Sequence, residues 1–133
     1  MAPTEAPCDA RVADGAIRGS LVGTLWAVYF GPSEVEALRE CGRLRVAASC
    51  ARYASLSVLS FGGFFGAYNG IQCGAERMFG PDSLACPIFA GGTVGAVIGA
   101  VALPPPHAVN AGMFGVGMAI VSGASAWAFG KRR

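Results

Sequence analysis

The chain has 133 residues, of which 14% are charged and 20 are glycine, with a formal net charge of +2. Soluble domains carry about 25% charged residues and roughly half this share of glycine. A soluble domain with so few charges could hardly cover its surface with polar groups, so the composition favours a membrane protein. The length suits one domain, which we expect over 1–133, and no nucleic-acid partner is expected.

The first expected membrane span covers about 14–31 and ends at Gly31-Pro32. It is short, and Arg18 near its start can extend its charged end to the membrane surface. The preceding acidic segment matches neither a secretory signal nor an Arg-rich transit peptide, so any organellar targeting information is expected to be internal. The charged stretch after this span is predicted to form an amphipathic surface helix, carrying Glu34, Glu36, Glu40, Arg39, Arg43, Arg45 and Arg52.

Three further spans follow from two stretches without Asp, Glu, Lys or Arg, at 53–75 and 83–130. About 20 apolar residues are needed to cross a bilayer. The second stretch is therefore long enough for two crossings, and the prolines at 104–106 divide it because they cannot continue a helix. The sequence predicts an all-α membrane protein with four short transmembrane helices, the later three at about 53–75, 86–103 and 107–129. The short third span predicts tilt or local bilayer thinning.

Small residues recur every four positions in each expected span, which places them on one helical face. Inside a membrane such faces let two backbones approach closely, and van der Waals packing drives association. We expect them to be the helix-packing surfaces. The residues are Gly15, Gly19 and Gly23; Gly62, Gly66, Gly70 and Gly74; Gly91, Gly95 and Gly99; and Ala111, Gly115, Ala119 and Gly123.

One glycine pattern occurs twice, as Gly-Gly-x-x-Gly-Ala-x-x-Gly at 62–70 and again at 91–99. We interpret the repeat as two neighbouring antiparallel helices that use the same packing device. Coincidence in a chain rich in Gly and Ala is the alternative. A phosphate-binding loop is a poor match, because such loops connect a strand to a helix and bring a charged partner.

Polar residues gather at the end of the second expected span. Asn69, Gln72 and Glu76 share one helical face, and Arg77 follows directly. Such a stripe can line an aqueous cavity or bind a partner helix; alternatively, Glu76 and Arg77 lie at the membrane surface and only the two amides are buried.

No set of catalytic residues is recognisable in the sequence. His107 has no second histidine or nearby carboxylate. Ser122 and Ser125 are predicted to bond to their own helix. We therefore expect a non-enzyme without metal or cofactor, apart from structural lipids.

The chain contains five cysteines: Cys8, Cys41, Cys50, Cys73 and Cys86. In the four-span arrangement Cys8, Cys73 and Cys86 lie on one side of the membrane. A disulfide between Cys8 and Cys73 would join the N-terminal arm to the end of the second span, and it requires an oxidising compartment. The alternative, in which all five are reduced, stays open because sequence alone does not establish pairing.

The stretch FGGFFGAYNGIQCGAERMFGPDSLACPIFAGGTVGAVIG, residues 61–99, resembles the core signature of the mitochondrial inner-membrane translocase (Tim) family, the preprotein and amino acid transporters. The likeness consists of glycine motifs, an acid–Arg–acid connector and an Ala-Gly-rich third span. Glu76, Arg77 and Asp82 match the connector, and residues 90–92 match the start of the third span. The resemblance implies four spans with both termini facing the intermembrane space.

Three branches of this family are similar to the chain. The translocase-like accessory subunit of respiratory complex I has cysteines at the places of Cys8 and Cys73. The carrier translocase subunit shares that arrangement and a Cys-x-x-Glu step like 73–76. The third branch is the plastid envelope pore. Translocases place an asparagine where this chain has Ala85, and more basic residues in the connector. These departures favour the accessory subunit of complex I over a protein-conducting role.

The resemblance therefore implies a non-catalytic structural subunit of the mitochondrial inner membrane, with other membrane subunits of complex I and membrane lipids as its partners. A carrier-insertion channel of the same membrane is the first alternative, and a plastid solute pore is the second.

Overall fold

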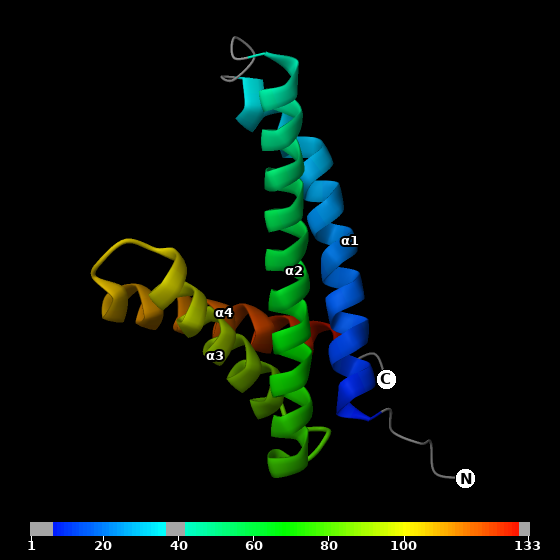
Figure 1. The fold of residues 1–133 in the computed structure, drawn as a ribbon. Coiled ribbons are helices and arrows are strands. Elements are labelled where there is room, and N and C mark those ends of the chain that lie inside the picture. Colours follow the sequence, from blue (N-terminus) through cyan, green and yellow to red (C-terminus); the bar gives the residue numbers. More distant parts are fainter. Residues whose placement is uncertain (1–6, 37–41, 131–133) are drawn as a thin grey trace. The chain divides into compact units, whose positions relative to one another are not determined.

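The computed structural model describes residues 7–36 and 42–130, and within them the fold is all-helical, without a β-strand (Figure 1). This confirms the predicted all-α class. The elements are α1 (Cys8–Val35), α2 (Arg43–Phe79), α3 (Ala85–Ala102) and α4 (His107–Gly130). Three of the expected spans lie within α1, α2 and α4, and the third, 86–103, coincides with α3 apart from its last residue.

The surface helix expected to lead into the second span is, where the structure describes it, continuous with that span. Arg43, Arg45 and Arg52 belong to α2, which runs for 37 residues without interruption. The physical reason is that no proline or other helix-breaking turn occurs between this charged segment and the apolar one. Glu34 closes the last turn of α1, whereas Arg39 and Glu40 lie outside the described residues.

Two of the described helices, rather than four, are long and apolar enough to cross a membrane: Ala85–Ala102 and His107–Phe129. The expectation of four strongly apolar spans is thus met only in part. In α1 the pair Asp14 and Arg18 lowers the apolar character. In α2 the apolar part carries no charge, but its serines and its amides Asn69 and Gln72 reduce the mean hydropathy.

Contacts divide the chain into two compact units. One unit is Val12–Gly66, which contains most of α1 and the first two thirds of α2. The other joins Met1–Arg11 to Ala67–Arg133, and thus holds the first turn of α1, the end of α2 and the whole of α3 and α4. The prediction of a single domain stays a prediction.

In the unit Val12–Gly66, α1 and α2 run antiparallel and touch through small residues (Figure 1). A Cβ atom added to Gly23 would lie 2.7 Å from the Ser57 carbonyl oxygen and 2.8 Å from the Val58 Cα. The buried positions of α1 recur every four residues, so a single stripe of the helix carries this contact. They are Gly15, Gly19, Gly23, Ala27 and Gly31.

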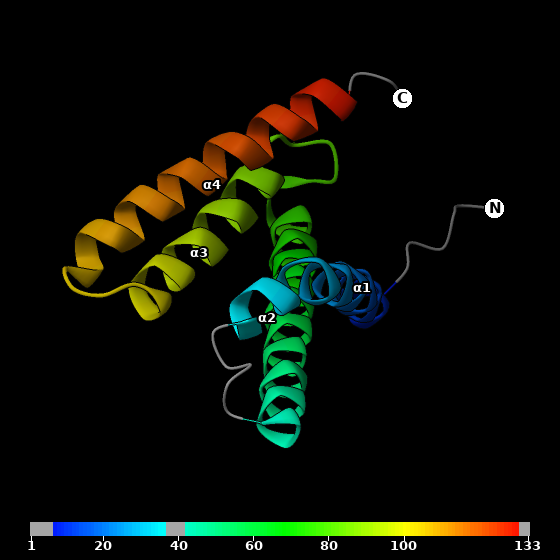
Figure 2. The ribbon, with the colours of Figure 1, turned by 90° about the horizontal axis from the view of Figure 1, so that it is seen from above.

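In the other unit, α3 and α4 form an antiparallel hairpin (Figures 1 and 2). The prolines at 104–106 separate the two helices, and the Asn110 side chain donates a hydrogen bond to the Pro104 carbonyl at 2.6 Å. A Cβ on Gly95 would lie 2.7 Å from the Met118 Cβ, and one on Gly99 2.7 Å from the Asn110 carbonyl carbon. The two backbones therefore lie almost in direct contact.

The two copies of the repeated glycine pattern serve different hairpins. Gly62 and Gly66 face α1, where Ala16 is the nearest shared neighbour, whereas Gly91 and Gly95 face α4. The end of the expected packing face of α2 behaves differently: Gly74 is exposed, and a Cβ built there would meet no atom of another segment within 4 Å. Gly70 is half-buried. Gly62 and Gly66, which pack against α1, thus lie before the polar end of that helix.

Replacing Gly99 by alanine should destabilise the α3–α4 hairpin, because the new methyl group would meet the backbone of Asn110 and Ala111 rather than a movable side chain. We expect a loss of about 1–3 kcal/mol in the free energy of unfolding, measured by thermal unfolding of the purified chain in detergent. Gly117→Ala is the matched control, since a Cβ there would meet no atom of another segment within 4 Å. Equal stability of the two variants would contradict close backbone packing.

Candidate functional site

The local structure at the end of α2 positions the polar residues singled out by the sequence. The helix ends at Phe79, and Gly80 follows with a positive φ of 88° that favours glycine. Its N–H donates to the Glu76 carbonyl at 2.9 Å, which closes the last helical turn. Glu76 is therefore held in that turn, and Asp82 lies in the short connector before α3.

A disulfide joins Cys8, the first residue of α1, to Cys73 near the end of α2. Their Cα atoms lie 5.8 Å apart, a usual separation for this bond. Cys73 is buried and Cys8 half-buried. The bond fixes the start of α1 beside the end of α2.

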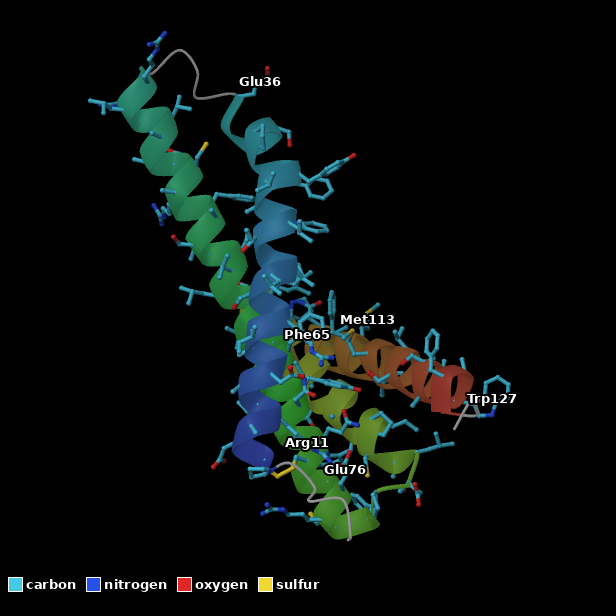
Figure 3. All side chains as sticks on the ribbon, turned by 90° about the vertical axis from the view of Figure 1, so that its right-hand side faces the viewer. Arg11, Glu36, Phe65, Glu76, Met113 and Trp127 are labelled. Atoms are coloured by element: carbon cyan, nitrogen blue, oxygen red, sulfur yellow. A yellow bond between two sulfur atoms is a disulfide. The ribbon has the colours of Figure 1, made fainter. Side chains whose placement is uncertain are left out.

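An ion pair lies one helical turn beyond each cysteine, between Arg11 and Glu76 (Figure 3). Side chains in a helix lean toward its N-terminus, so Arg11 extends back along α1. Because the first turn of α1 lies beside the end of α2, this direction leads to Glu76. Gln72 donates from Nε2 to the second carboxylate oxygen of Glu76 at 3.4 Å. The side chains of Arg11 and Glu76 are 33% and 18% exposed, so the pair is largely withdrawn from solvent.

Glu76 borders two cavities. The smaller, of about 180 Å³, lies beside the disulfide and is lined by Arg11, Arg77 and Pro81 among others. The larger, of about 750 Å³, opens between the end of α2, the connector and the end of α4. Its lining contains both charged and apolar side chains, and includes Glu76, Asp82, Leu84, Pro87, Trp127 and Phe129.

Of the polar residues predicted at the end of the second span, some therefore lie together at the cavity and others lie apart. Gln72 and Glu76 contact each other beside the larger cavity, and Asn69 is half-buried one turn earlier. Arg77 and Asp82 are both exposed. Of the two interpretations offered by the sequence, a cavity-lining stripe describes Gln72 and Glu76, and a surface position describes Arg77.

Sequence reasoning missed Arg11 as the partner of Glu76. A usable signal was present, because Arg11 follows Cys8 by three residues and Glu76 follows Cys73 by three residues. A disulfide between the two cysteines brings the next turns of both helices within reach of a long arginine side chain.

The remaining reactive groups lie apart from this pair. Cys50 is a free and exposed thiol, and Cys86 is a free and buried one whose Sγ lies 3.4 Å from the Gly80 carbonyl oxygen. His107 is exposed at the start of α4, and Ser125 bonds back to the Ser122 carbonyl at 2.9 Å. Cys41 lies outside the described residues. Over 7–36 and 42–130, no three His, Cys, Asp or Glu side chains gather where they could hold a metal ion.

Comparison with models of protein families, with curated proteins and with solved structures finds no match to this chain. The likeness of residues 61–99 to the translocase family therefore rests on the residues themselves. In the structure Glu76 and Arg77 belong to α2, Asp82 to the connector, and residues 90–92 to the second turn of α3.

Peptide mapping under non-reducing conditions should recover Cys8 linked to Cys73. With the protein folded and alkylated in detergent, Cys50 should react quickly and Cys86 slowly, because the first is exposed and the second is 1% exposed. Alkylation after denaturation provides the control, since it should label Cys50 and Cys86 equally. Free thiols at both Cys8 and Cys73 in freshly alkylated protein would contradict the disulfide.

Removing the charge of Glu76 should destabilise the chain, because Arg11 would keep a partly buried charge without its carboxylate. We expect Glu76→Gln to lower the free energy of unfolding by about 1–3 kcal/mol. Asp14→Asn is the matched control, since it removes the partner of Arg18 in a pair whose side chains are 57% and 75% exposed; such surface pairs contribute below about 1 kcal/mol. Thermal unfolding followed by tryptophan fluorescence measures the stability of both variants. An equal loss of stability in the two would contradict a larger contribution from the partly buried pair.

Proposed function

We propose that this chain is a non-catalytic structural subunit that crosses the mitochondrial inner membrane and braces neighbouring membrane subunits of respiratory complex I (NADH:ubiquinone oxidoreductase). The observation that carries the proposal is the distribution of side chains on α4. Its small residues face α3, whereas its large apolar ones point away: Met113, Ile120 and Trp127 are 70%, 64% and 62% exposed. An apolar face of this extent requires lipid or protein contacts.

The helix lengths support four crossings. At 1.5 Å per residue, the 28 residues of α1 extend about 42 Å and the 37 residues of α2 about 56 Å, more than the roughly 30 Å of hydrocarbon. The described part of α1 also exposes a stripe of large apolar side chains along one side: Ile17, Leu21, Leu25 and Val28. In the proposed arrangement α1 and α2 cross as a hairpin whose less apolar surfaces contact other subunits.

The proposed orientation follows from the disulfide. Four crossings place both termini on one side, together with Cys8 and the end of α2. The Cys8–Cys73 bond requires an oxidising compartment there, which the intermembrane space would supply. The resemblance of residues 61–99 to the translocase family gives the same orientation, and it supplies the mitochondrial inner membrane and complex I as the setting.

A channel subunit of the carrier translocase is the second candidate. It is favoured by the hydrogen-bonded side chains of Gln72 and Glu76 beside a cavity of about 750 Å³, because polar groups within an apolar bundle are typical of transport pathways. A plastid envelope pore would use the same cavity. The dispersal of Arg77 and Asp82 to exposed positions favours the structural role over both.

Native electrophoresis of mitochondria from the source cells, with mass spectrometry of the bands, should find the chain migrating with the membrane subunits of complex I. The physical reason is that apolar faces such as that of α4 are stably covered only by neighbouring subunits and lipid. Known subunits of complex I and of the carrier translocase, followed in the same gel, serve as internal controls. Migration with the carrier translocase and not with complex I would refute the proposal.

A further inference from the structure

The larger cavity beside Glu76 has the features of a lipid site. The geometry points to a phospholipid with a cationic ammonium headgroup, phosphatidylcholine or phosphatidylethanolamine, as its ligand. The volume of the cavity, about 750 Å³, lies in the range of small-ligand sites, about 300–1,000 Å³. Its lining combines polar side chains, such as Asp82 and Ser83, with apolar ones, such as Leu84 and Phe129, which suits the region where a headgroup joins its acyl chains.

The cavity lies at one end of the α3–α4 hairpin. The connector residues that line it immediately precede α3, and Trp127 and Phe129 belong to the last turns of α4 (Figure 3). This end of two helices able to cross a membrane is where headgroups would lie, and tryptophan concentrates at that depth. The apolar side chains of Leu84, Pro87 and Phe129 would contact the first carbons of the acyl chains.

The charged side chains that line the cavity determine which charge a bound headgroup should carry. The carboxylate of Glu76 is neutralised by Arg11. Asp82 also lines the cavity, and the ion pairs found among the described residues do not include it. Its carboxylate is therefore available to an ammonium group, and the ring of Trp127 adds a second attraction through its π face. Anionic headgroups would meet Asp82 unfavourably.

The phosphate would be held by the connector itself. The Ser83 Oγ accepts the Ala85 N–H at 3.2 Å, which leaves its own O–H able to donate to a phosphate oxygen. Ser83 follows Asp82 directly, so one short segment would hold the ammonium and the phosphate of the same headgroup. This inference rests on the proposed membrane placement of α3 and α4 but not on the identity of the host complex.

The test uses native mass spectrometry of the full chain in detergent, titrated separately with dioleoyl phosphatidylcholine, phosphatidylethanolamine and phosphatidylglycerol. We expect the first two lipids to bind about fivefold or more tightly than phosphatidylglycerol, a ratio typical of one ammonium–carboxylate contact with a cation–π contribution. Asp82→Asn should bring the three lipids to nearly equal binding. Trp127→Leu should weaken phosphatidylcholine, and Trp127→Phe should keep most of its binding.

Asp14→Asn is the control for a carboxylate that does not line the cavity, and it should leave the lipid preference unchanged. Free phosphocholine at the same concentrations separates a lipid site from a soluble-amine site, and binding as tight as that of the whole lipid would overturn the proposal. Equal binding of phosphatidylglycerol by the unmodified chain, or an unchanged preference in Asp82→Asn, would also overturn it. Neither result affects migration with complex I, so this inference and the proposed function fail separately.

Discussion

Close contact between helix backbones determines how this chain is built. In both hairpins a single methyl group added to a packing glycine would collide with main-chain atoms of the facing helix, as at Gly23 and at Gly99. Burial of large side chains contributes little here, because the buried apolar positions include Ala27, Ala90 and Val94 while the large apolar side chains are mostly exposed. Packing between small faces is the mode of association expected where lipid replaces water.

The outer surface follows from this packing. Because the small residues of each helix pack against its partner helix, the large residues of that helix point away from the partner. In α4 the residues Gly115 and Ser122 are buried, whereas Met113 and Ile120 are exposed. A soluble protein has the opposite distribution. The proposed function as a bracing subunit depends on this apolar exterior, since lipid and neighbouring subunits are the surroundings that stabilise it.

Polar interactions concentrate where the small-residue packing ends. Gly62 and Gly66 of α2 contact α1, and nearer the end of α2 the helix is held by the Cys8–Cys73 bond and the Arg11–Glu76 pair. Because Arg11 neutralises Glu76, Asp82 is the carboxylate of the larger cavity that lacks an ion-pair partner among the described residues. The proposed preference of the cavity for a cationic group therefore depends on Asp82 and not on the contact that stabilises the end of α2.

The helical class, the position of the turn at the prolines 104–106 and the small faces were readable from the sequence, because helix periodicity and proline sterics act over a few residues. The surface helix expected to lead into the second span is continuous with it in α2, since no local signal ends that helix before Phe79. Which helix each glycine face would contact was not readable from the sequence. Gly62 and Gly91 occur in the same motif, yet one meets α1 and the other α4.

The pairing of Cys8 with Cys73 could be expected from the sequence, but the tertiary structure established which other distant groups meet. Arg11 and Glu76 are 65 residues apart, and their equal spacing from the two cysteines is the one sequence signal for the ion pair. The larger cavity likewise needs the end of α2, the connector and the end of α4 at one place. By itself the sequence determined which faces are small enough to pack and that a helix must stop at the prolines 104–106. Only the fold decided which face opposes which, because that choice depends on contacts between segments far apart in the chain.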